Sequence, residues 1–171
     1  MNTKMVVRLS LLIGLEIALT RFASINTPIM RIGFGFLPIA VAGMMYGPLA
    51  AGMTAAAGDV IGALLFPIGP YFPGFTLTSC LTGVVFGLCL HKRQPNIPSL
   101  LIGAGITNVV LGLGLTPIWL WMLYGYGFAA MIPARLLQCL VMFHIQVYII
   151  GLVWRQLHLH LSKPASSEKI C

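Results

Sequence analysis

Two arginines, Arg21 and Arg31, bracket a short polar stretch between apolar segments, and a third, Arg135, lies in a later apolar segment. An arginine beside hydrocarbon is costly, so it normally faces water, an opposite charge or a ligand. Its planar guanidinium group suits bidentate binding of a carboxylate or phosphate. The three arginines therefore predict a pocket for an anionic ligand. Snorkelling to lipid headgroups, or pairing with Glu16 and Asp59, is the alternative.

The acidic residues Asp59 and Glu16 are the second chemical feature. Asp59 lies in a segment rich in glycine and alanine, where an unpaired carboxylate is costly. We expect it to pair with Arg21 or Arg135, or to accept hydrogen bonds from an amino-heterocycle. Glu16 lies deeper in the first apolar segment. It fits proton or ion coupling, or a contact between helices or subunits.

Aromatic residues cluster in two uncharged connections. Residues 67–74 contain three prolines and two glycines, with Tyr71 and Phe72 between them, which predicts a stiff, non-helical loop. Phe72 is a candidate to stack on a flat ligand ring, and Tyr71 to cover it. Trp119 belongs to the second connection, at 116–127. An interfacial aromatic belt is the alternative for these side chains.

The composition defines the class of protein that positions these residues. The chain has 171 residues, of which 58% are hydrophobic and 8% are charged, whereas a soluble domain carries roughly 25% charged residues. At about 20 residues per span, the length predicts an all-α integral membrane protein with six transmembrane helices. We expect one membrane domain over 1–171, with helices at 5–22, 32–46, 49–66, 75–90, 97–115 and 128–154, and a tail at 155–171.

The distribution of positive charge predicts the orientation. Of the ten Lys and Arg residues, seven fall on the side of the N-terminus in this arrangement: Lys4, Arg8, Lys92, Arg93, Arg155, Lys163 and Lys169. Positive charge is enriched on the cytoplasmic side, so we expect both termini, and the tail, in the cytoplasm. Arg21, Arg31 and Arg135 lie toward the other side, where this rule gives them no topological role.

Several function classes lack their signatures. The net charge of +7 comes from basic residues at segment ends, so nucleic-acid binding is not indicated. The four cysteines form no CxxC pair, so we expect neither a zinc site nor a disulfide framework. The sequence has no HExxH, GxSxG or P-loop motif. We therefore expect no catalytic or metal site, and any active transport must take its energy from a partner or an ion gradient.

Three stretches carry a resemblance to a known family: Arg21 to Ile39, Gly47-Pro48, and the unusual string from Asp59 to Thr78. They resemble the folate-specific substrate-binding S components of the energy-coupling factor (ECF) vitamin transporters, a type of ABC transporter. The similarity covers nearly the whole chain and is densest from Arg21 to Gly87. It implies the S-component fold and a pocket that opens to the outside and binds folate as substrate, with no cofactor.

The resemblance also implies partners. Members associate with a transmembrane coupling protein (the T protein) and two cytoplasmic ATPases, and are multi-pass proteins of the bacterial cell (plasma) membrane. A rotation of the S component is thought to carry the pocket inward. They pack on the coupling protein through an Ala-x-x-x-Ala pattern on the first helix. The nearest match here is Gly14 to Ala18, which keeps the spacing of small residues.

For folate, the arginines would hold the two carboxylates of the glutamyl tail, and Asp59 would accept hydrogen bonds from the pterin ring. The predicted substrate-binding residues are Arg21, Arg31, Asp59, Tyr71, Phe72, Trp119 and Arg135. Other hypotheses stay open: an S component for riboflavin, thiamin or a related compound, a self-sufficient ion-coupled carrier, or an intramembrane enzyme. A scaffold without a ligand would leave the arginines unexplained.

Overall fold

The computed structural model describes residues 3–26, 31–67, 70–91, 97–125 and 128–161. Within these ranges the chain is helical except for one short hairpin and the connections between elements. The elements are α1 (Thr3–Arg21), β1 (Ser24–Asn26), β2 (Arg31–Gly33), α2 (Phe36–Tyr46), α3 (Pro48–Leu65), α4 (Pro73–Leu90), α5 (Ile97–Gly105), the π-helix η1 (Ile106–Leu115), α6 (Thr116–Tyr124) and α7 (Phe128–Leu161).

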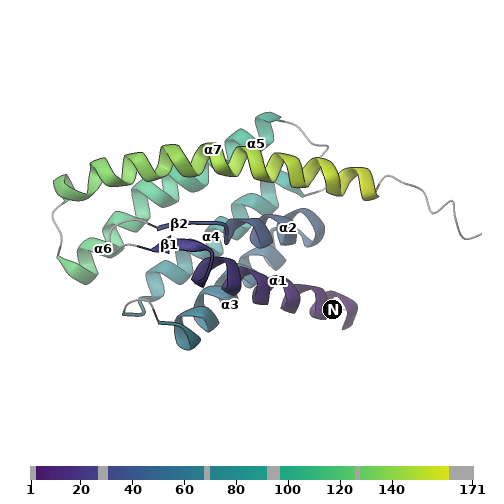
Figure 1. The fold of residues 1–171 in the computed structure, drawn as a ribbon, viewed down its shortest axis with the longest axis horizontal. Helices are drawn as coiled ribbons and strands as arrows, with labels where there is room; N and C mark the ends of the chain where they lie inside the picture. The colour runs from purple at the N-terminus through teal and green to yellow at the C-terminus, as the bar shows by residue number, and fades with distance from the viewer. Residues whose placement is uncertain (1–2, 27–30, 68–69, 92–96, 126–127, 162–171) are drawn as a thin grey trace, which may run out of the picture.

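Most helices run along the long axis of the molecule, with α7 on one side and α1 and α3 on the other (Figure 1). The hairpin β1–β2 lies between them, and β2 contacts α7. The first residues of α1 and the last described residues of α7 lie at the same end of the bundle (Figure 1). This is the arrangement expected when both ends of the chain face the same side of a membrane.

Four helical segments are long and apolar enough to cross a membrane: Pro48–Leu65, Pro73–Leu90, Ile97–Leu123 and Ile132–Gln156. The helix α2 is apolar but short, and α1 contains Lys4, Arg8, Glu16 and Arg21. The predicted all-helical membrane fold is therefore confirmed, whereas the number of six spans stays a prediction.

Small residues bring α3 and α4 into close contact. A Cβ atom added at Gly83 would lie 2.4 Å from the carbonyl oxygen of Ala51, and one at Gly87 would lie 2.2 Å from the Cα of Pro48. Helices that present glycine to one another can approach until their backbones touch. The buried cluster beside this contact includes Phe36, Ile39, Phe86, Leu90, Ile150 and Trp154. This cluster packs α2, α4 and α7 against one another.

The second helix begins later than the sequence predicted. Residues 31–33 form β2, which pairs antiparallel with β1, so that Ser24 lies opposite Gly33 and Asn26 opposite Arg31. A Cβ atom at Gly33 would lie only 2.4 Å from the Cβ of Ser24. The strands can therefore pair this closely because Gly33 has no side chain. The helix α2 then starts at Phe36 instead of residue 32.

The predicted connection at 116–127 is largely helical instead. The chain continues from α5 through η1 into α6, which ends at Tyr124, where Gly125 adopts a left-handed conformation with φ of 67°. Pro117 lies in the first turn of α6 and does not end the helix. At the C-terminal end, α7 extends to Leu161, beyond the predicted boundary at residue 154.

Candidate functional site

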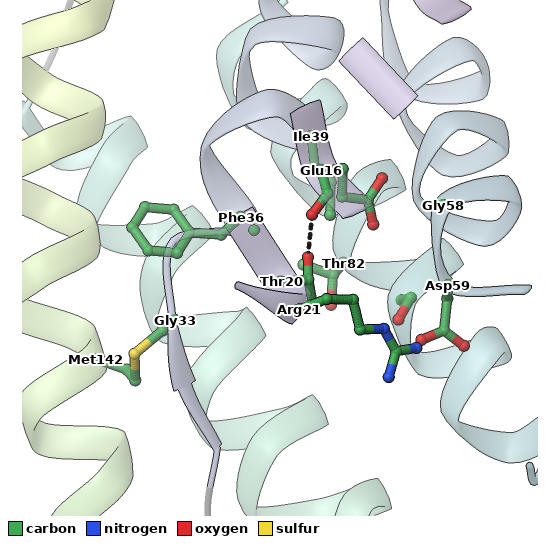
Figure 2. A pocket seen from close by; sticks show the side chains of 12 residues that line it. Glu16, Thr20, Arg21, Gly33, Phe36, Ile39, Gly58, Asp59, Thr82 and Met142 are labelled. Atoms are coloured by element: carbon green, nitrogen blue, oxygen red, sulfur yellow. Dashed lines mark hydrogen bonds between the residues drawn. The ribbon is translucent and has the colours of Figure 1, made fainter. Parts of the chain in front are cut away.

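A cavity of about 180 Å³ opens beside the C-terminal end of α1. It is enclosed by α1, β2, α2, α3 and α4, and Met142 of α7 closes one side (Figure 2). Pockets that bury a drug-sized ligand usually measure about 300–1,000 Å³, so this cavity holds only part of such a molecule. Its lining residues are Glu16, Thr20, Arg21, Gly33, Gly35, Phe36, Ile39, Gly58, Asp59, Ser79, Thr82 and Met142.

Arg21 and Asp59 form the charged wall of the cavity. Arg21 is the last residue of α1, and Figure 2 shows its guanidinium group directed toward the Asp59 carboxylate on α3. The two opposite charges are close enough to attract each other. Gly62, about one turn beyond Asp59, makes room for the arginine, because a Cβ atom there would lie 3.1 Å from Arg21 Nε. The sequence suggested Arg21 or Arg135 as the partner of Asp59, and the structure places Arg21 beside it.

The Asp59 carboxylate is also fixed from α4. The Thr76 hydroxyl donates a hydrogen bond of 2.7 Å to Asp59 Oδ2. The Tyr71 hydroxyl lies 3.1 Å from Thr76 Oγ1. A threonine hydroxyl has one hydrogen, which goes to Asp59, so Tyr71 is the donor in this second bond. The three residues form a hydrogen-bonded chain from the proline-rich loop to the cavity.

Glu16 lies deeper in the same cavity. Its side chain is only 4% exposed and faces α3, where a Cβ atom at Gly58 would lie 2.2 Å from Glu16 Oε2. The Thr20 hydroxyl donates to the backbone carbonyl oxygen of Glu16 (Figure 2). Of the roles that the sequence left open for Glu16, a contact between helices is the one that this geometry provides.

Two of the predicted aromatic residues, Phe72 and Trp119, lie in a separate cluster near the start of α4. The rings of Phe72 and Trp119 are 5.6 Å apart and those of Phe72 and Phe75 are 6.1 Å apart. Trp119 Nε1 donates a hydrogen bond of 3.1 Å to Thr78 Oγ1. The described residues that line the cavity do not include Tyr71, Phe72 or Trp119. Among the described residues, the chain through Thr76 connects this cluster with Asp59.

The structure separates Arg135 from the cavity. Arg135 lies on α7, is 7% exposed, and donates a hydrogen bond of 3.1 Å from Nη1 to Gln138 Oε1. Its Nε is buried and has no hydrogen-bond partner among the described residues. Arg31 begins β2, whose Gly33 lines the cavity, but the Arg31 side chain lies outside the described part of the chain. Convergence of the three arginines thus stays a prediction.

A polar contact within the bundle joins η1 to α7. Asn108 Nδ2 donates to Gln146 Oε1 over 2.7 Å and to the Ala104 carbonyl oxygen over 2.8 Å. Gln138, on the same helix as Gln146, accepts a separate hydrogen bond from Arg135. Asn108 and Gln146 are both buried, so this pair holds η1 against α7.

The predicted subunit contact faces outward. Gly14 and Ala18 lie on the exposed side of α1, and a Cβ atom at Gly14 would have nothing within 4 Å. Leu11, which is 69% exposed, and Leu15, which is 46% exposed, flank Gly14. This face of α1 makes no close contact with the described remainder of the chain at Gly14.

Sequence reasoning overlooked Thr76, Thr20, Thr82, Ser79 and Gly33 as residues at the site. Each is a small residue whose type is common in membrane helices and loops, so type alone does not distinguish it. For Thr76, the one available signal is its place in the first turn after the proline-rich loop. For Gly58 and Gly62, the signal was their position on either side of Asp59 in a segment rich in glycine and alanine.

Comparison with known proteins places this geometry in a family context. Residues 4–154 match the family model described as "ECF transporter, substrate-specific component". The chain is 40% identical to the folate transporter FolT of Clostridium novyi (strain NT) over 154 residues, which is 90% of each chain. It is 31% identical to the folate transporter FolT of Leuconostoc mesenteroides subsp. mesenteroides over 155 residues, 87% of this chain and 83% of the relative.

Two solved structures are similar in fold to this chain. The crystal structure of FolT bound with folic acid superposes with a TM-score of 0.82 at 34% identity, covering 88% of this chain and 93% of that one. The S component of a bacterial ECF transporter superposes with a TM-score of 0.66 at 24% identity, covering 94% of this chain and 98% of that one. The second match concerns the fold alone.

Proposed function

We propose that this chain, which belongs to the family of ECF transporter substrate-specific components, binds folate in the cavity beside Arg21 and delivers it for uptake. The protein is a multi-pass membrane protein. The observation that carries the proposal is a cavity walled by Arg21 and Asp59 in a chain 34% identical to a folate-binding FolT.

The chemistry of folate suits the charged wall. The glutamyl tail carries two carboxylates, and guanidinium groups bind carboxylates through paired hydrogen bonds. Arg21 stands at the end of α1, and Arg31 begins the strand that borders the cavity. Since the cavity of about 180 Å³ holds only part of the ligand, the ring occupies it and the tail lies toward the arginines at its mouth.

The aromatic cluster has a supporting role in this proposal. Phe72 and Tyr71 belong to the loop that approaches the cavity through Thr76. A movement of this loop toward the cavity would bring Phe72 over the ligand, as the sequence suggested. Trp119 anchors the cluster through its bond to Thr78. Arg135 lies on α7 and is not among the described residues that line the cavity.

Energy for transport comes from partners in this proposal. The chain supplies substrate binding, while a transmembrane coupling protein and two cytoplasmic ATPases drive the transport cycle, so the chain itself is not an enzyme. The exposed face of α1 around Gly14 and Ala18 is the contact we assign to the coupling protein. Small residues at this spacing allow close helix packing.

Direct binding tests the proposal. The chain is purified in detergent, any small molecule that remains bound is identified by mass spectrometry, and binding of folic acid, riboflavin and thiamin is measured by calorimetry. We expect folic acid to bind and the other two vitamins to fail. Binding of riboflavin or thiamin in place of folic acid would replace the proposed substrate.

A reconstitution experiment separates the proposed S component from a self-sufficient carrier. Liposomes containing the chain alone should not accumulate folate, with or without a proton gradient. Liposomes that also contain the coupling protein and the ATPases should accumulate folate when ATP is supplied. Accumulation by the chain alone would favour the ion-coupled carrier.

A further inference from the structure

Glu16 is a carboxylate at the cavity that the proposed binding set does not include. It precedes Arg21 by five residues on α1, which corresponds to about 7.5 Å along the helix axis. Its side chain is 4% exposed and lines the cavity. The cavity therefore has two levels. Arg21 and Asp59 lie near the C-terminal end of α1, and Glu16 lies about one and a half helical turns before that end.

The helix α3 provides space for both levels in the same way. Gly58 faces Glu16, with a hypothetical Cβ atom 2.2 Å from Oε2, and Gly62 faces Arg21, with a hypothetical Cβ atom 3.1 Å from Nε. The two glycines are four residues apart, close to one helical turn. Alanine at residue 58 would push the Glu16 carboxylate out of its present position. The placement of Glu16 at the cavity thus depends on the absence of a side chain at residue 58.

Asp59 is engaged by two groups of the protein itself. Its Oδ2 accepts the hydrogen bond of Thr76, and the Arg21 guanidinium group is directed toward it (Figure 2). Figure 2 shows the Glu16 side chain on the other side of Thr20 from the Arg21–Asp59 pair. The ring of a ligand whose tail binds at Arg21 would extend toward Glu16.

We propose that Glu16 determines specificity by recognising the ring of the ligand. This inference rests on the proposed function. The 2-amino-4-oxopteridine ring of folic acid presents two adjacent donors, the amino group and a ring N–H, and one carboxylate accepts both. The Arg21–Asp59 pair then serves the tail end of the ligand.

The test compares folic acid with its 2-deamino-2-oxo analogue, in which an acceptor replaces the amino donor. Affinities are measured by calorimetry on the purified full-length protein. The wild type should prefer folic acid by at least about tenfold, the scale of one hydrogen bond to a charged group. Glu16→Gln should bind folic acid at least about tenfold more weakly, and the preference should shrink or reverse, because the amide supplies one acceptor and one donor.

Two alanine substitutions on α3 form a matched pair. Gly58→Ala displaces the Glu16 carboxylate and should reduce the preference for folic acid over the analogue. Gly62→Ala disturbs Arg21 instead and should weaken both ligands by the same factor, leaving the preference unchanged. Thermal unfolding in detergent verifies that each variant is folded. If Glu16→Gln does not fold, Gly58→Ala decides, because it keeps the carboxylate and displaces only the end of a flexible side chain.

The outcomes separate this inference from the proposed function. If the wild type does not bind folic acid, the proposed function is wrong. If the wild type binds folic acid but does not distinguish the analogue, or if Glu16→Gln or Gly58→Ala keeps the wild-type preference, the role of Glu16 is wrong and the proposed function stands.

Discussion

The charged residues of the cavity are ordered along α1, and this order gives a ligand a direction. Arg21 stands at the end of the helix and Glu16 five residues earlier. A molecule with a carboxylate at one end and N–H donors at the other is oriented by these two side chains. Asp59 balances the charge of Arg21 and is held by Thr76.

The arginines can be tested one at a time. Arg21→Ala and Arg31→Ala should each weaken folate binding by about 1–3 kcal/mol, the scale for losing a hydrogen bond to a charged group. Calorimetry with pteroic acid, which lacks the glutamyl tail, supplies the control, since each substitution should affect it less. If both variants bound folate with wild-type affinity, the assignment of the arginines to the pocket would be wrong.

At the residue scale, the sequence revealed the charged side chains and missed the small ones. Arg21 and Asp59 are conspicuous because a charge in an apolar segment requires a reason. Thr76 and Gly58 carry no such signal, because their importance comes from the side chains that another helix places beside them. The distance from Glu16 to Gly58 depends on the packing of α1 on α3, which no local pattern in the sequence encodes.

At the scale of elements, the proline-rich loop is connected with the cavity by the hydrogen-bonded chain of Tyr71, Thr76 and Asp59. The Asp59 carboxylate keeps its orientation toward Arg21 because Thr76 holds one of its oxygens. A change in the loop at Tyr71 therefore reaches the charged wall of the cavity through one hydroxyl group.

Substitution of Thr76 tests this connection. Thr76→Val keeps the shape but removes the donor, and should weaken folate binding by about 1 kcal/mol. Thr76→Ser keeps the hydroxyl and should retain most of the affinity. Thr54→Val is the control, because the Thr54 hydroxyl bonds only the Ala50 carbonyl oxygen among the described residues. Equal affinities of the Val and Ser variants at residue 76 would contradict a role for the hydroxyl.

The buried pair Asn108 and Gln146 makes a prediction about stability. Asn108→Ala removes the donor of the 2.7 Å bond and leaves Gln146 Oε1 without it. Hydrogen bonds between membrane helices contribute about 0.6–2 kcal/mol, so the variant should unfold at a lower temperature in detergent. A double-mutant cycle with Gln146→Ala should give a coupling energy in this range. A coupling energy of zero would show that the two side chains act independently.

The sequence predicted the long apolar helices more accurately than the segments between them. Strand pairing replaced the expected helix start at residue 32, because residues 24–26 are available as a partner for 31–33. Thr116-Pro117 suggested an end to the fifth helix, but the helical backbone continues through both residues into α6. In both places the secondary structure depends on a neighbouring segment, which is the opposite strand in the first case and the adjoining helix in the second. A local sequence pattern does not contain this information.

At the scale of the whole molecule, composition alone established the class. A chain with 58% hydrophobic and 8% charged residues cannot hide its apolar surface in a soluble domain, and the helices match that prediction. The count of spans is harder, since α1 carries four charged residues and α2 has 11 residues. Such short or charged helices depend on their neighbours for their place in the membrane.

If the exposed face of α1 contacts the coupling protein, a substitution on this face should impair folate uptake without changing folate affinity. Gly14→Leu should leave the folate affinity of the purified chain unchanged, because nothing lies within 4 Å of a Cβ atom there. It should abolish folate uptake in cells that supply the coupling protein and the ATPases. Gly114→Leu, at another exposed glycine with nothing within 4 Å, should affect neither measurement. Normal uptake with Gly14→Leu would contradict the assigned contact.

The π-helix η1 also sets the rotational phase of α6 on its C-terminal side. Its hydrogen bonds join residues five apart, as does the bond from the Thr116 hydroxyl to the Leu111 carbonyl oxygen. Because a π-helix has more residues per turn than an α-helix, a change of η1 to α-helical winding would turn α6 about the helix axis. Trp119 would then leave Phe72 and Thr78, and the aromatic cluster would lose its anchor without any change in its own residues. The direction of the Trp119 side chain therefore depends on the winding of the preceding helix η1.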